Sequence, residues 1–278
     1  MATNIIDSVG TTPTPVEIDL VDQHLPSNCL YIFTDIETES FLAFLLLQIA
    51  AVTSEGHQFN VFINPYCPLS QSCTNLLGFY FYKGRLFRNG RPLPAKPVKQ
   101  ALHEFATWIS NFDRPVVLVY HNGFSFDCAV LAKHLIRFNI PIPRNLITVC
   151  DSLPYIRTHF KAPTVANHKL GTLASHFGII HEHAHDALSD SLVLKQVIEK
   201  ISTENNVDYK TIFKESCRPF SEYIDKILYG KPIQPLRRKK KTKTKKKKSD
   251  PAKADGATIS EKSKDVLSVK AEQEPKTV

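Results

Sequence analysis

The sequence lacks the patterns that mark secreted and membrane proteins. Its six cysteines are scattered, form no C-x-x-C pair and accompany no signal-peptide pattern, so we expect reduced thiols in an intracellular protein. No apolar run is long enough to cross a bilayer. The longest begins at Phe41 and is interrupted by Gln48, which indicates a buried strand and no membrane partner.

The part of the chain before residue 237 also lacks a strong net charge. The whole chain has a formal charge of +8, but ten of its basic residues lie between Arg237 and Lys248. Residues 1–236 hold 20 Lys and Arg against 21 Asp and Glu, a net charge of −1. The basicity therefore belongs to the tail and says little about a binding surface on the folded domain.

Apolar periodicity predicts one α/β domain between two tails, with no internal repeat. Strands joined as hairpins are expected at 30–34, 45–53 and 58–64, then strands at 116–120 and 147–150. The expected helices cover 95–112, 124–138, 170–177 and 187–201. We predict one folded domain over 29–230, with its catalytic core at about 30–203 and a helical extension at 205–230. Two disordered tails should flank it: residues 1–28, and residues 231–278, which are basic at first and then polar.

Asp35 and Glu37 flank Ile36 at the end of the first predicted strand. Because side chains alternate along a strand, both carboxylates should leave the same face. Two adjacent anions suggest a divalent cation, but a D-x-E triplet alone is a weak signal, and an exposed strand end is the alternative.

The segment from His121 to Asp127 follows an apolar strand and opens a predicted helix. Polar groups gather at this place in α/β folds, and Asp127 should lie in the first helical turn. The alternative is ordinary capping by Asn122 or Ser125.

His185 precedes the last predicted helix, whose first turns carry Asp190 beside small residues. Room around Asp190 favours a substrate or a metal ion. A capped helix start with solvated acids is the alternative.

In their order and context these three elements resemble the DEDDh exonucleases, the group that contains three-prime repair exonucleases and polymerase proofreading subunits. The resemblance covers about residues 30–200, including the segments Cys150–Leu153 and His168–Leu173. It implies an RNase H-like three-layer α/β fold whose five-stranded mixed sheet has the order 3-2-1-4-5 with strand 2 antiparallel. The chain is also similar to the exonuclease-like C-terminal domain of the long promyelocytic leukaemia protein isoform and to its stand-alone fish relatives.

Carried over by position, the resemblance implies a complete catalytic set. Its members are Asp35, Glu37, Asp127, His185 and Asp190. Four carboxylates in one site need counter-charge, and oxygen ligands favour Mg²⁺ or Mn²⁺. We expect two such ions, roughly 3.5–4 Å apart, with the four acids as ligands and His185 as the base, in a 3′→5′ exonuclease that releases 5′-mononucleotides from DNA or RNA. We expect no organic cofactor.

The resemblance also implies substrate-binding positions. They are Ile36, Thr38, Leu77, Gly78, Phe79, His121, Asn122 and Phe126. The stretch from Phe79 to Arg91 interleaves aromatic and basic residues, which suits stacked bases and phosphates of single-stranded or 3′-ended nucleic acid. A β-hairpin that packs its aromatic residues on the core is the alternative.

The tails carry short motifs of their own. The basic run Arg237–Lys248 predicts nuclear import, Val16–Asp22 resembles a SUMO-interacting strand, and Lys270 lies in a SUMO-acceptor-like site. The rival function is a weakly active or inactive nuclear interaction module on an exonuclease scaffold, related to SUMO and to bodies formed by the promyelocytic leukaemia protein. The oligomeric state stays open, with a dimer as the alternative that the three-prime repair exonucleases imply.

Overall fold

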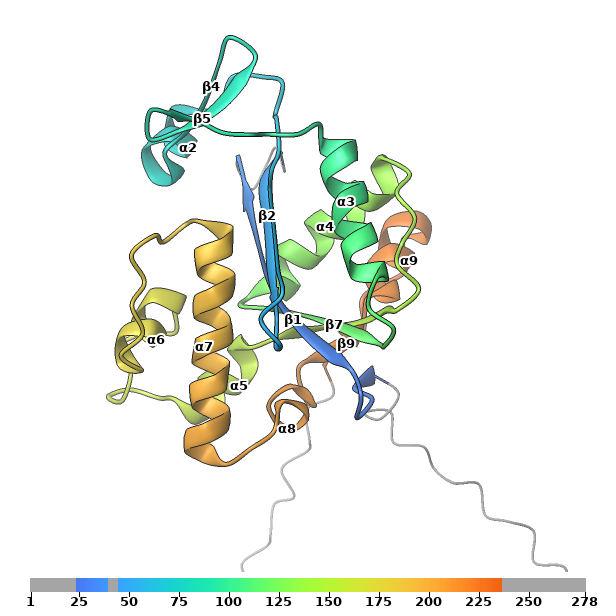
Figure 1. Cartoon of the computed structure of the whole chain (residues 1–278). Helices are drawn as coiled ribbons and strands as arrows, with labels where there is room; N and C mark the ends of the chain where they lie inside the picture. The colour runs from blue at the N-terminus through green and yellow to red at the C-terminus, as the bar shows by residue number, and fades with distance from the viewer. Residues whose placement is uncertain (1–23, 40–44, 237–278) are drawn as a thin grey trace, which may run out of the picture. The chain divides into compact units, whose positions relative to one another are not determined.

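The computed structural model describes residues 24–39 and 45–236, which form a six-stranded mixed sheet with helices on both faces (Figure 1). In spatial order the strands are β3 (Gln58–Phe62), β2 (Leu46–Thr53), β1 (Leu30–Thr38), β7 (Val116–Tyr120), β8 (Leu146–Asp151) and β9 (Cys217–Pro219). The strands β1, β7 and β8 are parallel, whereas β2 is antiparallel to both of its neighbours. The predicted α/β class and the antiparallel second strand are confirmed.

The sixth strand corrects the predicted count of five. β9 pairs antiparallel with β8, and it lies between α8 (Tyr209–Phe213) and α9 (Ser221–Tyr229) in the segment expected to be entirely helical. Three residues that include a proline show no apolar alternation, and proline is tolerated in an edge strand. The pairing of β9 therefore depends on the exposed edge of β8.

The two faces of the sheet have separate hydrophobic clusters. One face packs against α7 (Ala187–Asn205), α6 (Leu170–His176), α5 (Leu153–His159) and α8, and the other against α3 (Val98–Ser110), α4 (Asp127–Arg137) and α9 (Figure 1). Alternate residues of β1 supply both clusters, with Phe33 on the α7 side and Ile32 on the α3 side. The result is the expected arrangement of three layers.

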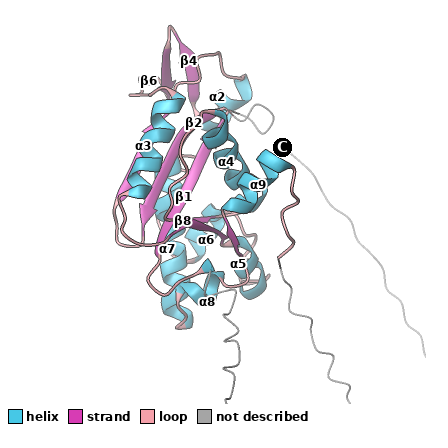
Figure 2. Ribbon diagram, turned by 90° about the vertical axis from the view of Figure 1, so that its right-hand side faces the viewer, coloured by secondary structure: helices cyan, strands magenta, loops and turns pink. Residues whose placement is uncertain are grey.

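A smaller unit, which we call the hairpin insert, comprises residues 71–92 between β3 and α3. It consists of α2 (Gln71–Leu77) and a three-stranded sheet of β4 (Phe79–Tyr82), β5 (Arg85–Arg88) and β6 (Arg91–Pro92). Its core includes Phe79 and Leu86 and rests on Leu47 of β2. The insert thus lies near the end of the sheet where β2 begins and β1 ends (Figure 2).

The folded region extends further at both ends than the predicted boundaries. Leu25 is fully buried, and the carbonyl of His24 accepts a hydrogen bond from Thr148 Oγ1 at 2.7 Å, so the chain packs before residue 29. After residue 230, Ile233 packs against the α3-side cluster. The motifs at Val16–Asp22, Arg237–Lys248 and Lys270 lie outside the described residues.

All six cysteines are free thiols. Among residues 24–39 and 45–236, no helix combines the length and the apolar character that a membrane span requires.

Candidate active site

Polar residues gather at the edge of the sheet where its parallel strands end. β1 pairs with β7 only from Leu30 to Phe33, so Asp35 and Glu37 lie beyond the end of the β1–β7 pairing. Asp151 is the last residue of β8, which runs parallel to β7. The carboxyl ends of parallel strands in an open α/β sheet are where such folds place their sites.

Asp35 and Glu37 lie on the same face of β1, as the alternation around Ile36 predicts. Ile36 packs in the α3-side cluster, so the two carboxylates point to the α7 side. Across the β1–β2 pair, Glu37 lies opposite Gln48, a fully buried polar residue in an otherwise apolar strand.

Asp127 reaches the same edge through a tight turn after β7. Asn122 adopts a left-handed conformation with φ +65°, and a short 3-10 helix, η1 (Gly123–Ser125), leads into α4 at Asp127. A side chain at Gly123 would be 2.3 Å from Tyr120 Cβ, so only glycine allows this close approach. The turn therefore brings the first residue of α4 back to the end of the sheet.

Asp151 anchors this turn through backbone hydrogen bonds. Its Oδ1 accepts from the N–H groups of Asn122 at 2.8 Å and Leu153 at 2.9 Å, and its Oδ2 accepts from Phe124 N–H at 3.2 Å. The carboxylate is only 3% exposed. The C-terminal extension supports the turn from outside, because Tyr223 Oη donates to the Phe124 carbonyl at 3.3 Å.

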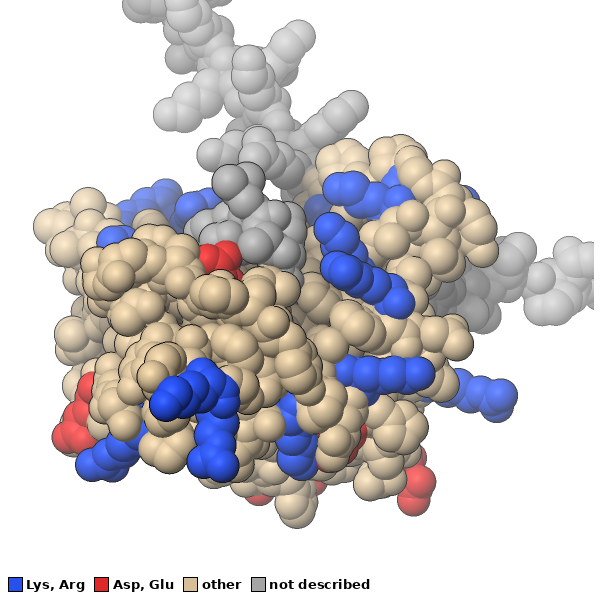
Figure 3. Space-filling model, turned by 90° about the horizontal axis from the view of Figure 1, so that it is seen from above, with Lys and Arg blue, Asp and Glu red and all other residues tan. Residues whose placement is uncertain are grey.

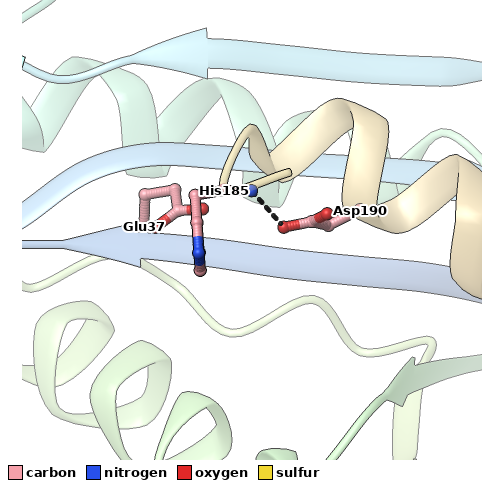
Figure 4. Close-up of side chains that lie close together, drawn as sticks. All are labelled: Glu37, His185 and Asp190. Atoms are coloured by element: carbon pink, nitrogen blue, oxygen red, sulfur yellow. Dashed lines mark hydrogen bonds between the residues drawn. The ribbon is translucent and has the colours of Figure 1, made fainter. Parts of the chain in front are cut away.

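His185, in the loop before α7, and Asp190, in the first turn of α7, complete the group. His185 N–H donates to Asp190 Oδ2 at 3.1 Å, shown as the dashed line in Figure 4, and the His185 residue is exposed. One ligand atom from each of Glu37, His185 and Asp190 lies within 4.8 Å of the others. His181 Nε2 lies 2.5 Å from Asp190 Oδ1, so both oxygens of Asp190 have partners.

Four carboxylates at this edge affect one another's ionisation: Asp35, Glu37, Asp127 and Asp190. Burial raises the pKa of Asp35 well above its ordinary range, and the other three carboxylates raise it further. Burial, followed by the charge of Asp190, raises the pKa of Glu37 to about 8. Burial raises the pKa of Asp127 to about 7, and it also raises that of Asp190 despite the His181 hydrogen bond.

These raised pKa values indicate a site that binds cations. Buried carboxylates ionise together only when positive charge compensates them, and metal binding would replace the protons that the site otherwise retains. Carboxylate oxygens suit hard divalent cations such as Mg²⁺ and Mn²⁺. The residues present therefore fit the metal chemistry that the sequence predicts.

Comparison with known families identifies the domain. The family model described as exonuclease (RNase_T) matches residues 33–198, which is more than half of the chain. The chain belongs to the exonuclease family. The match contains every residue of the predicted catalytic set, and members of this family use divalent metal ions.

Curated relatives of this exonuclease domain include much longer proteins. The chain is 32% identical over 215 residues to the PolC-type DNA polymerase III of Streptococcus pneumoniae serotype 4, and 32% identical over 227 residues to that of Streptococcus sanguinis. These matches cover 72% and 76% of this chain but only 13% and 14% of the two polymerases. The chain therefore corresponds to a small part of either relative.

Solved structures of E. coli exonuclease I share the fold of this exonuclease domain. Its zinc-bound complex with single-stranded DNA has a TM-score of 0.52 at 17% identity, over 64% of this chain and 41% of that chain. Its complex with a dA16 oligonucleotide has a TM-score of 0.52 at 18% identity, over 64% and 42%. The architecture is thus the RNase H-like fold of exonucleases.

Several predicted substrate-binding residues have side chains that face the interior of this exonuclease domain. Ile36, Leu77 and Phe79 are buried in apolar clusters, so their side chains are not open to a nucleotide. Gly78 is the left-handed C-cap of α2, and a side chain there would be 2.1 Å from Asn89 Oδ1. The local core of the hairpin insert and the sheet core take up these apolar side chains, and the substrate-binding assignments of the four residues remain predictions.

The remaining predicted substrate-binding residues lie nearer the surface. Asn122 is exposed at the turn, whereas Thr38 and Phe126 are half-buried. His121 Nε2 donates to the carbonyl of His168 at 2.7 Å, and its Nδ1 accepts from Ser152 Oγ at 2.8 Å, as in a neutral imidazole. Burial lowers the pKa of His121, which agrees with this neutral form.

Sequence reasoning missed four residues that support the site. They are Gln48, Arg88, Asp151 and His181. Gln48 and Asp151 had a local signal, because each is a polar residue within or at the end of an apolar strand. Arg88 and His181 had none that separates them from neighbouring arginines and histidines.

Proposed function

We propose that the chain is a metal-dependent 3′→5′ exonuclease of the DEDDh type that hydrolyses DNA and releases 5′-mononucleotides. The main support is the convergence of four carboxylates and His185 at the carboxyl edge of the sheet. Family membership supports the same reaction class. Nothing in the described residues favours the non-catalytic alternative, because every carboxylate that the reaction needs is present.

The four carboxylates and His185 have separate roles in this proposal. Asp35, Glu37, Asp127 and Asp190 would hold two Mg²⁺ or Mn²⁺ ions, which when bound acidify water and offset charge on the scissile phosphate. The exposed imidazole of His185 would take the proton of the attacking water. His185 lies beside Glu37 and Asp190 (Figure 4), which puts the base next to the charged centre. The residue is also exposed to solvent.

The outer face of the hairpin insert is the surface that we assign to the nucleic acid strand. Cross-strand pairing puts Tyr80 with Phe87 and Tyr82 with Arg85 on the face opposite the buried Phe79. Tyr80 and Phe87 stack at 5.0 Å, Tyr82 is 57% exposed and Arg85 is exposed. Exposed aromatic rings beside cations suit stacked bases and phosphates.

The charge of this region supports a polyanionic partner. Between Glu55 and Glu104 the sequence has six Lys and Arg and no Asp or Glu. Seen from above, Lys and Arg predominate over Asp and Glu on the described surface (Figure 3). The solved complexes of E. coli exonuclease I contain single-stranded DNA or dA16, so we propose a single strand with a free 3′ end as the substrate.

The test is a degradation ladder with the full chain and a 5′-labelled single-stranded DNA oligonucleotide in Mg²⁺ or Mn²⁺. We expect stepwise shortening, no release of the labelled 5′ nucleotide at the start, and protection by a blocked 3′ end. Asp35→Ala and His185→Ala should abolish shortening, whereas the exposed neighbour His183→Ala should not. No shortening by the wild type with either metal would refute the proposal, and a matched RNA ladder tests the DNA preference.

We further propose that the tails direct the enzyme in the cell. Deleting 237–248 should shift the protein from nucleus to cytoplasm if Arg237–Lys248 drives import. The same microscopy with Lys270→Arg, together with a blot for SUMO conjugates, tests the link to the promyelocytic leukaemia protein and SUMO. An unchanged conjugate pattern contradicts Lys270 as the acceptor.

A further inference from the structure

His185 has a backbone conformation that its side chain disfavours. Its φ of +64° lies in the left-handed region, where residues other than glycine are strained and persist only when neighbouring groups hold them. Two hydrogen bonds hold this residue: its N–H donates to Asp190, and its carbonyl accepts from Arg88 Nη2 at 2.8 Å. The conformation of the loop therefore involves a side chain 97 residues away in the sequence.

Arg88 directs its whole guanidinium group toward this loop. Nη2 contacts the His185 carbonyl, Nη1 lies 2.5 Å from Asp186 Oδ2, and Nε donates to the Leu77 carbonyl at 3.2 Å. The group lies 5.0 Å from the centre of the Phe79 ring, and its side chain is 16% exposed. Because all three guanidinium nitrogens already have partners, few N–H groups of Arg88 remain to bind a phosphate.

Asp186 connects Arg88 to the start of α7. Its Oδ1 accepts from the N–H groups of Leu188 and Ser189, each at 3.1 Å, and so caps the helix. Its Oδ2 accepts from Arg88 and from Gln48 Nε2, the latter at 3.3 Å. The hairpin insert, β2 and the helix that carries Asp190 are thereby joined at one carboxylate.

We propose that Arg88 is a positioning residue, which holds the His185 loop against the carboxylates through its contacts to the His185 carbonyl and to Asp186. The role of the loop in catalysis rests on the proposed function, whereas the contacts themselves do not. Arg88 thus differs from Arg85, which points to the outer face of the same hairpin.

The test compares Arg88→Met with Arg91→Met in the full chain. Arg91 pairs with Arg88 across β5 and β6 and is exposed. Its side chain has no hydrogen bond or ion pair within the described part of the chain, so its substitution removes the same charge without the contacts. Hydrogen–deuterium exchange of the metal-free protein should show amides 185–189 exchanging about ten-fold faster in Arg88→Met, and not in Arg91→Met. Arg88→Lys should remain impaired because one ammonium cannot replace the fork.

Kinetics on the single-stranded DNA substrate give an independent measurement. We expect Arg88→Met to lower kcat by about 10- to 100-fold with KM nearly unchanged. A displaced His185 would lose its alignment as the general base, whereas the affinity of the enzyme for its substrate would not change. A rise in KM alone would identify Arg88 as a phosphate contact and overturn the inference. Asp186→Asn, which keeps a helix-capping side chain but loses the charge, should give the same pattern if Arg88→Met does not fold.

The two proposals fail in different ways. Unchanged exchange at 185–189 in Arg88→Met refutes the positioning role whatever the enzymatic activity, and so does full recovery by Arg88→Lys. A wild type without exonuclease activity refutes the proposed function, while faster exchange in Arg88→Met would still support the contact.

Discussion

Replacing Glu37 by glutamine should stabilise the metal-free protein at neutral pH. Glu37 is 8% exposed, and burial together with the charge of Asp190 raises its pKa from an ordinary 4.5 to about 8. The folded chain thus keeps a proton that the unfolded chain releases, so the stability of the metal-free protein falls as pH rises from about 4.5 to about 8. A neutral amide at this position removes that loss.

The size of the effect follows from the two pKa values. Relative to its value at low pH, the free energy of unfolding is lowered by the raised pKa of Glu37 by about 3 kcal/mol at about pH 7 and by about 1 kcal/mol at about pH 5. Glu37→Gln should therefore gain about 2 kcal/mol more at the higher pH. For about 200 structured residues this is roughly 5 °C in Tm.

Thermal melts of the metal-free chain at the two pH values measure this difference. Glu204→Gln, a change at an exposed glutamate of α7, is the matched control and should show no pH-dependent gain. Added Mn²⁺ should raise the Tm of the wild type more than that of Glu37→Gln, because the ion compensates a charge that the variant lacks. Equal Tm changes at both pH values, or a loss at pH 7, would refute the reasoning about burial and charge.

Two further predictions concern the turn and the hairpin. Asp151→Ala should destabilise the protein by about 3 kcal/mol, because three backbone N–H groups lose a charged acceptor, and should weaken the Mn²⁺-induced rise in Tm. Asp113→Ala, at an exposed loop, is the control. Equal melting temperatures of the two variants would contradict the anchoring role of Asp151. The double change Tyr82→Ala and Arg85→Ala should weaken binding of single-stranded DNA about ten-fold in filter assays and reduce its salt dependence. Tyr66→Ala, at another exposed aromatic residue, should leave binding unchanged, and unaltered affinity in the double variant would leave the hairpin with a structural role only.

Much of the fold was predictable because its strands are strongly patterned. The apolar strands at 45–53 and 116–120 appear as β2 and β7, and alternation correctly puts Asp35 and Glu37 on one face of β1. Short elements were not predictable in the same way. The three residues of β9 pair because β8 presents an open edge. The helix α2 ends at Gly78, where the side chain of Asn89 leaves no room for a Cβ atom.

The sequence by itself determined the catalytic candidates and the elements that carry them, since strand alternation and the polar residues after apolar strands are local properties. Only the tertiary structure decided that the carboxylates converge with raised pKa values, that Phe79 is buried, and that Arg88 turns inward to His185 rather than outward to a phosphate. The physical reason is sequence separation. A contact such as Arg88 to His185 depends on how the hairpin insert packs on β2 and beside α7, and no periodicity within either segment records it.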